Sequence, residues 1–388
     1  MTTTPVENEI EMGDERAFAS AVASDAQTAE AVPPWGRLQY ERIVIAPPDE
    51  YVKLVDTGLY ESDWYFPERE RKELAARFAA FGVDRAVQRQ LLNASELDED
   101  AGCRRVYITN DLIRSIPIET RAKIYNYLQQ DDRNVAQTNA FRFCSDSVDD
   151  WFDGTQVRPS VIDRVKGMVF RNGSYLVFAD FRLIEAELQN EFEKSQLLKS
   201  LCRDSTLVMY LQFDSQTDID QLVRYWGRHG RGKDVRPLIE SLALQSGPTK
   251  IDVSHLLPAF ARRRIYSYPN LTTDDVIRRR DCHWTAHNFL SSIPDDRLVT
   301  NLYDELSRRM DGEFYQIFGD YKMGDLVEFI DQEGTVFHSA TYIADDVLFT
   351  KNGYSALGSW HFCRLSEMKD YYTRRTPVRV SFFRRKTS

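Results

Sequence analysis

A cysteine that follows an arginine-rich segment is the residue of this sequence best suited to act as a nucleophile. Cys282 comes directly after Arg278-Arg279-Arg280-Asp281. The apolar residues after it recur at helical spacing on the side of Cys282: Ala286, Phe289, Leu290 and Ile293. Unpaired amides at a helix start and nearby arginines both favour thiolate over thiol, and Asp281 is expected to cap the helix. The pattern predicts a reactive thiol facing whatever this helix covers.

A histidine farther along the chain is the residue expected to take the thiol proton. Residues 324–330 and 335–343 are predicted to form neighbouring strands, and period-two alternation puts His338 on one face with apolar residues. An imidazole on a strand can reach a thiol on a helix that packs against that strand. Cys282 and His338 are therefore predicted to form the Cys–His pair of an activated nucleophile.

These segments resemble a known family. Asp-Cys at a helix start, Gly-Asp-Leu-Val-x-Phe at 324–329 and His-x-small-x-Tyr-Ile at 338–343 resemble the NlpC/P60 branch of the papain-like cysteine peptidases. The resemblance covers about 120 residues, from near Tyr266 to near Phe383. It implies a helix packed on an antiparallel sheet, with Cys282 as nucleophile and His338 as general base.

The resemblance also implies a polar group that orients the imidazole, and two residues are candidates. Register favours Thr350, whereas Asn352 has an amide oxygen that is better suited to accept from an imidazole N–H. Tyr268 corresponds to a tyrosine that lines the family's site. His283 and Trp284 stand where the family usually has Ser-Gly, so they are expected to contact the substrate.

The predicted function is a cysteine hydrolase of the peptidase or amidase type that acts on a peptide-like or acyl substrate and needs no cofactor. The alternatives are a thiol acyltransferase and a non-catalytic interaction protein that retains a papain-like scaffold. His283 and His287 have a zinc-like spacing, but the Glu of H-E-x-x-H is missing and no third ligand is visible, so no metal is predicted.

A glycine-rich string earlier in the chain is not expected to bind nucleotides. Gly227 to Lys233 satisfies G-x-x-x-x-G-K, but Asp234 replaces the Ser or Thr that holds magnesium, and the residues before it have helical rather than strand periodicity. The residues are instead expected to form a basic loop between helices. A patch made by Arg224, Arg228, Arg231, Lys233 and Arg236 leaves polyanion binding as a further alternative.

Composition limits the function classes. Of the net charge of −10, six units lie in residues 1–36, so the remainder is nearly balanced and nucleic-acid binding is not expected. That acidic tail is predicted to be disordered. No apolar stretch is long enough to cross a membrane, and a cytoplasmic location is predicted; the oligomeric state is left open. The five cysteines form no C-x-x-C pair, which argues against disulfides or a zinc ribbon.

The predicted fold class is α+β with a boundary near residue 250. Residues 37–250 are expected to form a mostly helical domain of unknown role, which includes a hairpin at Asn172-Gly173. Residues 251–388 are expected to form the papain-like (NlpC/P60-type) hydrolase domain. Helices at 255–264 and 282–309 precede strands at 325–330, 336–343, 346–350, 360–363 and 378–383.

Overall fold

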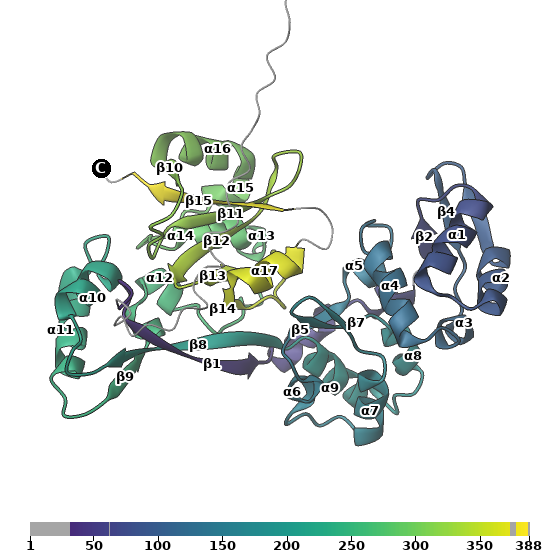
Figure 1. Ribbon diagram of the computed structural model, residues 1–388, viewed down its shortest axis with the longest axis horizontal. Helices are drawn as coiled ribbons and strands as arrows, with labels where there is room; N and C mark the ends of the chain where they lie inside the picture. The colour runs from purple at the N-terminus through teal and green to yellow at the C-terminus, as the bar shows by residue number, and fades with distance from the viewer. Residues whose placement is uncertain (1–31, 62, 373–377, 387–388) are drawn as a thin grey trace, which may run out of the picture. The chain divides into compact units, whose positions relative to one another are not determined.

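Helices alternate with small antiparallel sheets along this chain (Figure 1). The structure is a computed structural model, and it describes residues 32–61, 63–372 and 378–386. The helices are α1 (Arg71–Phe81), α2 (Arg85–Asn93), α3 (Asn110–Arg114), α4 (Ile118–Leu128), α5 (Val135–Thr138), α6 (Val148–Phe152), α7 (Pro159–Lys166), α8 (Phe181–Glu185), α9 (Glu191–Leu201), α10 (Ile219–Trp226), α11 (Gly232–Ala243), α12 (Ala259–Arg262), α13 (Asp275–Arg278), α14 (Cys282–Asn288), α15 (Arg297–Thr300), α16 (Leu302–Glu313) and α17 (Leu365–Tyr372).

The strands pair antiparallel throughout the described residues, which confirms the α+β class. They are β1 (Arg37–Ile45), β2 (Trp64–Phe66), β3 (Ser95–Asp98), β4 (Cys103–Val106), β5 (Phe141–Cys144), β6 (Phe170–Asn172), β7 (Tyr175–Phe178), β8 (Asp204–Phe213), β9 (Thr249–Asp252), β10 (Phe314–Ile317), β11 (Leu326–Ile330), β12 (Val336–Ala344), β13 (Val347–Lys351), β14 (Trp360–Arg364) and β15 (Arg379–Arg385).

Local sequence signals explain several elements of the first half. Helix α1 ends at Phe81 because Gly82 adopts φ 85°, a left-handed conformation that glycine tolerates best. The predicted hairpin is present as β6 and β7, with Gly173 at φ 57° in the turn. Helices α1 to α9 share one hydrophobic core with the sheets β2-β4-β3 and β5-β7-β6.

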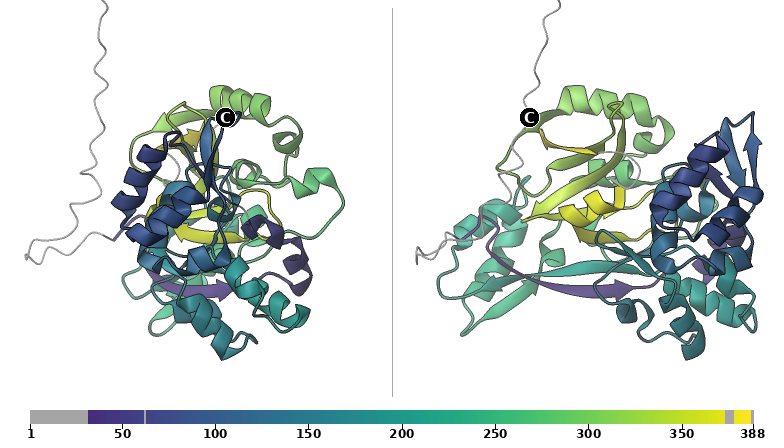
Figure 2. Two further views of the ribbon diagram at one scale, coloured as in Figure 1. Left: turned by 90° about the vertical axis from the view of Figure 1, so that its right-hand side faces the viewer. Right: turned by 45° about the vertical axis from the view of Figure 1, so that its right-hand side comes forward.

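A long pair of strands joins the start of the first predicted domain to a segment near its end. Strand β1 pairs with β8 over its whole length, and β9 adds to the other edge of β8, which Figure 2 shows from two further sides. The boundary predicted near residue 250 falls inside β9. The second hydrophobic core combines Leu207 and Leu211 of β8 with Phe349 and Phe362 of the C-terminal strands, so its residues come from both sides of that boundary.

The sheet expected from the C-terminal strands has the order β10-β15-β11-β12-β13-β14. Helix α14 covers one face, where Trp284 and Phe289 pack against Phe349 and Phe362. Helix α17 covers the opposite face, where Met368 packs against Phe329 and Leu348 (Figure 1). The helix-on-antiparallel-sheet arrangement matches the expectation, whereas the family assignment of this domain stays a prediction.

Some elements differ from the sequence expectations. The helix expected over 282–309 is divided into α14, α15 and α16, because Pro294 has no N–H for a continuous helix and Asn288 bonds to the backbone of Asp295 instead. Strand β1 and helix α17 were not anticipated. Residues 1–31, which carry most of the predicted disordered tail, lie outside the described residues. Within the described residues, no helix is long and apolar enough to span a membrane.

Candidate functional site

Helix α14 positions the candidate nucleophile at its first residue. The Asp281 carboxylate accepts a hydrogen bond of 2.9 Å from the Trp284 backbone N–H, so Asp281 caps the helix as expected. The Trp284 indole donates to Asp296 and packs against Phe260 in the core. These contacts hold Cys282 against the sheet, where only 4% of its surface is exposed.

The sheet presents a row of buried polar side chains beneath the first turn of α14. Ser381 of β15 pairs with Glu328 of β11, and Glu328 pairs with Ser339 of β12. The β12–β13 register, continued by two residues from Thr341, puts Ser339 beside Lys351. All four side chains are buried. Charged groups in such a position require partners, so this row is unusual for a structural sheet face.

His283 of α14 completes this group, which we call the α14 polar cluster: Cys282, His283, Glu328, Ser339 and Lys351. The Nδ1 atom of His283 lies 2.8 Å from Ser339 Oγ. Cys282, His283 and Asp281 each offer a ligand-type atom within 4.8 Å of the others, so the thiol and an imidazole nitrogen are close neighbours. The cluster thus places a thiol beside an imidazole.

Burial shifts the titration of three members of the cluster. It raises the pKa of Glu328 to about 7, while the neighbouring His283 opposes the shift. It lowers the pKa of His283, with Asp281 and Glu328 opposing. It also lowers the pKa of Lys351 to about 8, against the opposing charges of Cys282 and Asp281. The pKa values of Glu328 and Lys351 are thereby moved toward neutrality, which is typical of sites that transfer protons.

The structure does not bring Cys282 and His338 together, which corrects the predicted pair. His338 Nδ1 lies 2.8 Å from the Tyr372 hydroxyl of α17, and its Nε2 lies 3.1 Å from Thr350 Oγ1. His338 and Ser339 are consecutive on β12 and point to opposite faces, and Ser339 is the one beneath α14. The face that α14 covers is therefore the opposite of the one that the sequence argument assumed.

The two candidates for the third group have different surroundings. Thr350 is placed against His338 as expected, although not within reach of the thiol. The amide oxygen of Asn352 is buried and has no hydrogen-bond partner among the described residues. Asn352 lines a cavity of about 730 Å³ together with His361 and Tyr372. Asn352 directly follows Lys351 of the α14 polar cluster, but its amide oxygen makes no hydrogen bond to the described residues of that cluster.

The residues predicted to bind the substrate, Tyr268, Trp284 and His283, make contacts within the fold. The Tyr268 hydroxyl donates to the backbone oxygen of Ile45 on β1, at 3.3 Å. Trp284 is fully buried in the second core, so it has a packing role rather than an exposed binding surface. The imidazole of His283, which was expected to contact the substrate, lies within 4.8 Å of the Cys282 sulfur.

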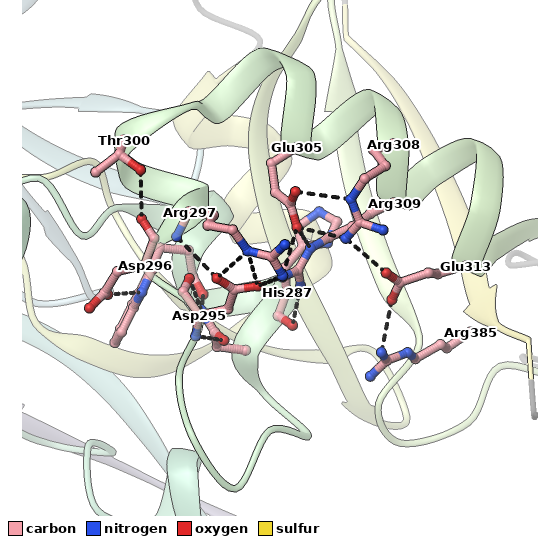
Figure 3. Close-up of polar contacts among 12 residues, drawn as sticks. His287, Asp295, Asp296, Arg297, Thr300, Glu305, Arg308, Arg309, Glu313 and Arg385 are labelled. Carbon is pink, nitrogen blue, oxygen red and sulfur yellow. Dashed lines mark hydrogen bonds and ion pairs between the residues drawn. The ribbon is translucent and has the colours of Figure 1, made fainter.

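The second histidine of the zinc-like spacing belongs to a different environment. Burial, followed by the charge of Arg309, lowers the pKa of His287 to about 3, and neither ring nitrogen has a hydrogen-bond partner among the described residues. Figure 3 shows the ion-pair network beside it, in which Arg309 bonds to Glu305 at 2.8 Å and to Asp295 at 2.5 Å. His287 is therefore a neutral buried residue beside the ion pairs of Arg309, which have a structural role.

Among the described residues, the group whose side chains could hold a metal ion is Asp281, Cys282 and His283. One oxygen of Asp281 already accepts from Trp284, and Nδ1 of His283 already bonds to Ser339. The Lys351 ammonium near Cys282 adds a positive charge that opposes a cation. We assign no metal to these residues.

Three members of the cluster were missed by the sequence reasoning: Glu328, Ser339 and Lys351. A signal for two of them was available. Glu328 interrupts the apolar strand Leu326–Ile330, and Lys351 ends the apolar strand Val347–Lys351. A charge inside a strand that is buried on both faces indicates a special site.

Comparisons with known proteins give no relative. No family model matches the chain, and no curated protein and no solved structure matches it. The relationship to the NlpC/P60 family remains a prediction from its motifs.

Proposed function

We propose that this chain is a cysteine-dependent acyl hydrolase or acyltransferase whose acid–base group is His283 rather than His338. The observation that carries the proposal is the α14 polar cluster, in which a thiol and an imidazole lie within 4.8 Å over buried Glu328, Ser339 and Lys351. Buried ionisable groups oppose folding unless they are paired, and their clustering at one nucleophile favours a chemical role.

The cluster suggests a division of tasks. The Lys351 ammonium, which donates to the backbone oxygens of Gly353 and Ser355, places a positive charge near the Cys282 sulfur. His283 takes the proton of the Cys282 thiol, the sulfur attacks an acyl carbon and the bond to the leaving group breaks, and His283 returns that proton to the leaving group. Ser339, which bonds to His283 Nδ1, orients the imidazole, and Glu328 balances the charge on it. Water or another acceptor then releases the acyl group from sulfur.

A second candidate function is the non-catalytic interaction protein. The specific observation that favours it is closure of the site, because Cys282 is 4% exposed and Lys351 is fully buried. Substrate would reach the sulfur only after local opening of the residues that cover it. A covalent trapping experiment separates the two functions.

The test uses p-nitrophenyl acetate as an acyl donor and mass spectrometry to locate the adduct. We expect acetylation at Cys282, with a rate that falls by about 100-fold in His283→Gln, since general acid–base groups contribute at least this much. His338→Gln and the exposed-residue control His255→Gln should retain the rate. Circular dichroism checks that each variant is folded.

Two outcomes would contradict the proposal. Acetylation spread over several cysteines would favour the non-catalytic scaffold. Loss of the adduct in a folded His338→Gln variant, with His283→Gln unaffected, would restore His338 as the base.

A further inference from the structure

A second cavity lies on the part of the fold that carries the glycine-rich string. It has a volume of about 350 Å³ and lies between the loop before α11, one face of α11, the segment around α12 and the residues after α14. Arg231, Arg262, His229 and His255 supply its basic side chains, Asp234 supplies one carboxylate, and Ser291 adds a hydroxyl. Its size falls in the range of about 300–1,000 Å³ that is usual for small-molecule sites.

Two arginines give this cavity its charge. The guanidinium of Arg231 donates to the backbone oxygens of Trp226 and Leu256, which fix its position. Burial lowers the pKa of Arg231, and the charge of Arg262 acts in the same direction, with Asp234 opposing. Within residues 32–61, 63–372 and 378–386, neither arginine forms an ion pair. Two cations are thus held near each other, and the carboxylate of Asp234 is the single acid on the same cavity wall.

The glycine-rich string serves as the support of this cavity. A Cβ atom on Gly227 would lie 2.5 Å from the oxygen of Val223 and 2.7 Å from Cα of Gly232, so these glycines let the two ends of the loop meet. Between them His229 has φ 55° and Gly230 has φ 78°. This tight turn places His229 and Arg231 on the cavity wall. The spacing of the string therefore has a packing reason that does not require a nucleotide.

We propose that this cavity binds a small phosphate monoester that carries an apolar group. Guanidinium groups match the geometry of phosphate oxygens, and the imidazoles and Ser291 offer further donors. Val235, Leu238 and Leu257 form an apolar wall for the remainder of the ligand. A wide polyanion surface is less consistent with the structure, because Arg236 of the predicted basic patch is paired with Asp220 and Glu240.

The experiment uses phenyl phosphate with the full chain, followed by isothermal titration calorimetry and by the shift of the thermal midpoint. We expect millimolar or tighter binding, which Arg262→Gln weakens by about tenfold. Arg262 is exposed and makes no side-chain hydrogen bond or ion pair with other described residues, so its replacement should not disturb folding. Arg263→Gln is the matched control, because Arg263 is the exposed neighbour that does not line the cavity.

Each result has a defined meaning. Selective loss in Arg262→Gln, with phenol inert toward the wild-type chain, supports a phosphate site in this cavity. Absence of a heat change or midpoint shift at millimolar phenyl phosphate overturns it. Equal weakening by Arg262→Gln and Arg263→Gln, together with tighter binding of single-stranded DNA, also overturns it in favour of a diffuse polyanion surface.

Discussion

Glu328 is the residue whose titration most directly reports the α14 polar cluster. Its pKa is raised by burial to about 7, above its ordinary value near 4.5, so the folded protein retains a proton that the unfolded chain loses earlier. The sign follows from linkage: the stability from this group is complete below about pH 4.5 and is lost as the pH rises through about 7. The cluster therefore makes the fold less stable in alkali.

The corresponding prediction concerns Glu328→Gln. Relative to the wild type, this variant should gain stability between pH 5 and pH 8, by on the order of 3 kcal/mol, from about 1.4 kcal/mol per pKa unit. Urea unfolding at the two pH values measures the difference. Glu333→Gln, which changes an exposed carboxylate near the same strand, should show no such pH-dependent gain. A gain that is equal at both pH values would mean that Glu328 is ionised throughout.

At the scale of elements, the packing between α10 and α11 depends on Gly227, because a side chain at this position would overlap with backbone atoms. Gly227→Ala would place its Cβ against backbone atoms of Val223 and Gly232. We expect a loss of stability of more than about 2 kcal/mol, because the backbone must shift to relieve the overlap. Thermal or urea unfolding of the variant provides the value.

Gly312→Ala is the matched control for that prediction. Gly312 lies inside α16, and a Cβ there meets nothing within 4 Å. Since alanine favours a helix interior over glycine, this substitution should be neutral or stabilise by up to about 1 kcal/mol. If both variants lose equal stability, the close contact between Gly227 and Gly232 is not the reason that Gly227→Ala destabilises the protein.

The elements also show where the sequence argument was sufficient. Strand β11 and strand β12 were predicted almost to the residue, because period-two alternation and turn residues are local properties. Helix α14 covers one of the two faces of β12, and the choice of that face is not a local property of the sequence. It depends on α17, which the sequence analysis did not anticipate and which occupies the face of His338. The sequence analysis placed α14 on the face of His338, whereas the structure places it on the face of Ser339 and puts His283 beside the thiol.

At the scale of the whole molecule, residues of β8 hold the edge strand β14 of the six-stranded sheet in place. Thr206 of β8 accepts from the Phe362 backbone N–H and donates to the Phe362 oxygen of β14. Asp204 accepts from Ser359 just before β14. Strand β14 in turn pairs with β13, which carries Lys351. The role of the helical first half was unpredictable from its own sequence, because these contacts join segments more than 150 residues apart.

The central claim is that Lys351 activates Cys282, and the rate of alkylation by iodoacetamide as a function of pH tests it most directly. Cys103 provides an internal reference, because it is buried and its pKa is raised by burial. The account predicts that Cys282 is alkylated faster than Cys103, and that Lys351→Met slows the alkylation of Cys282 while the protein remains folded. Identical profiles for the two cysteines, unchanged in Lys351→Met, would contradict it.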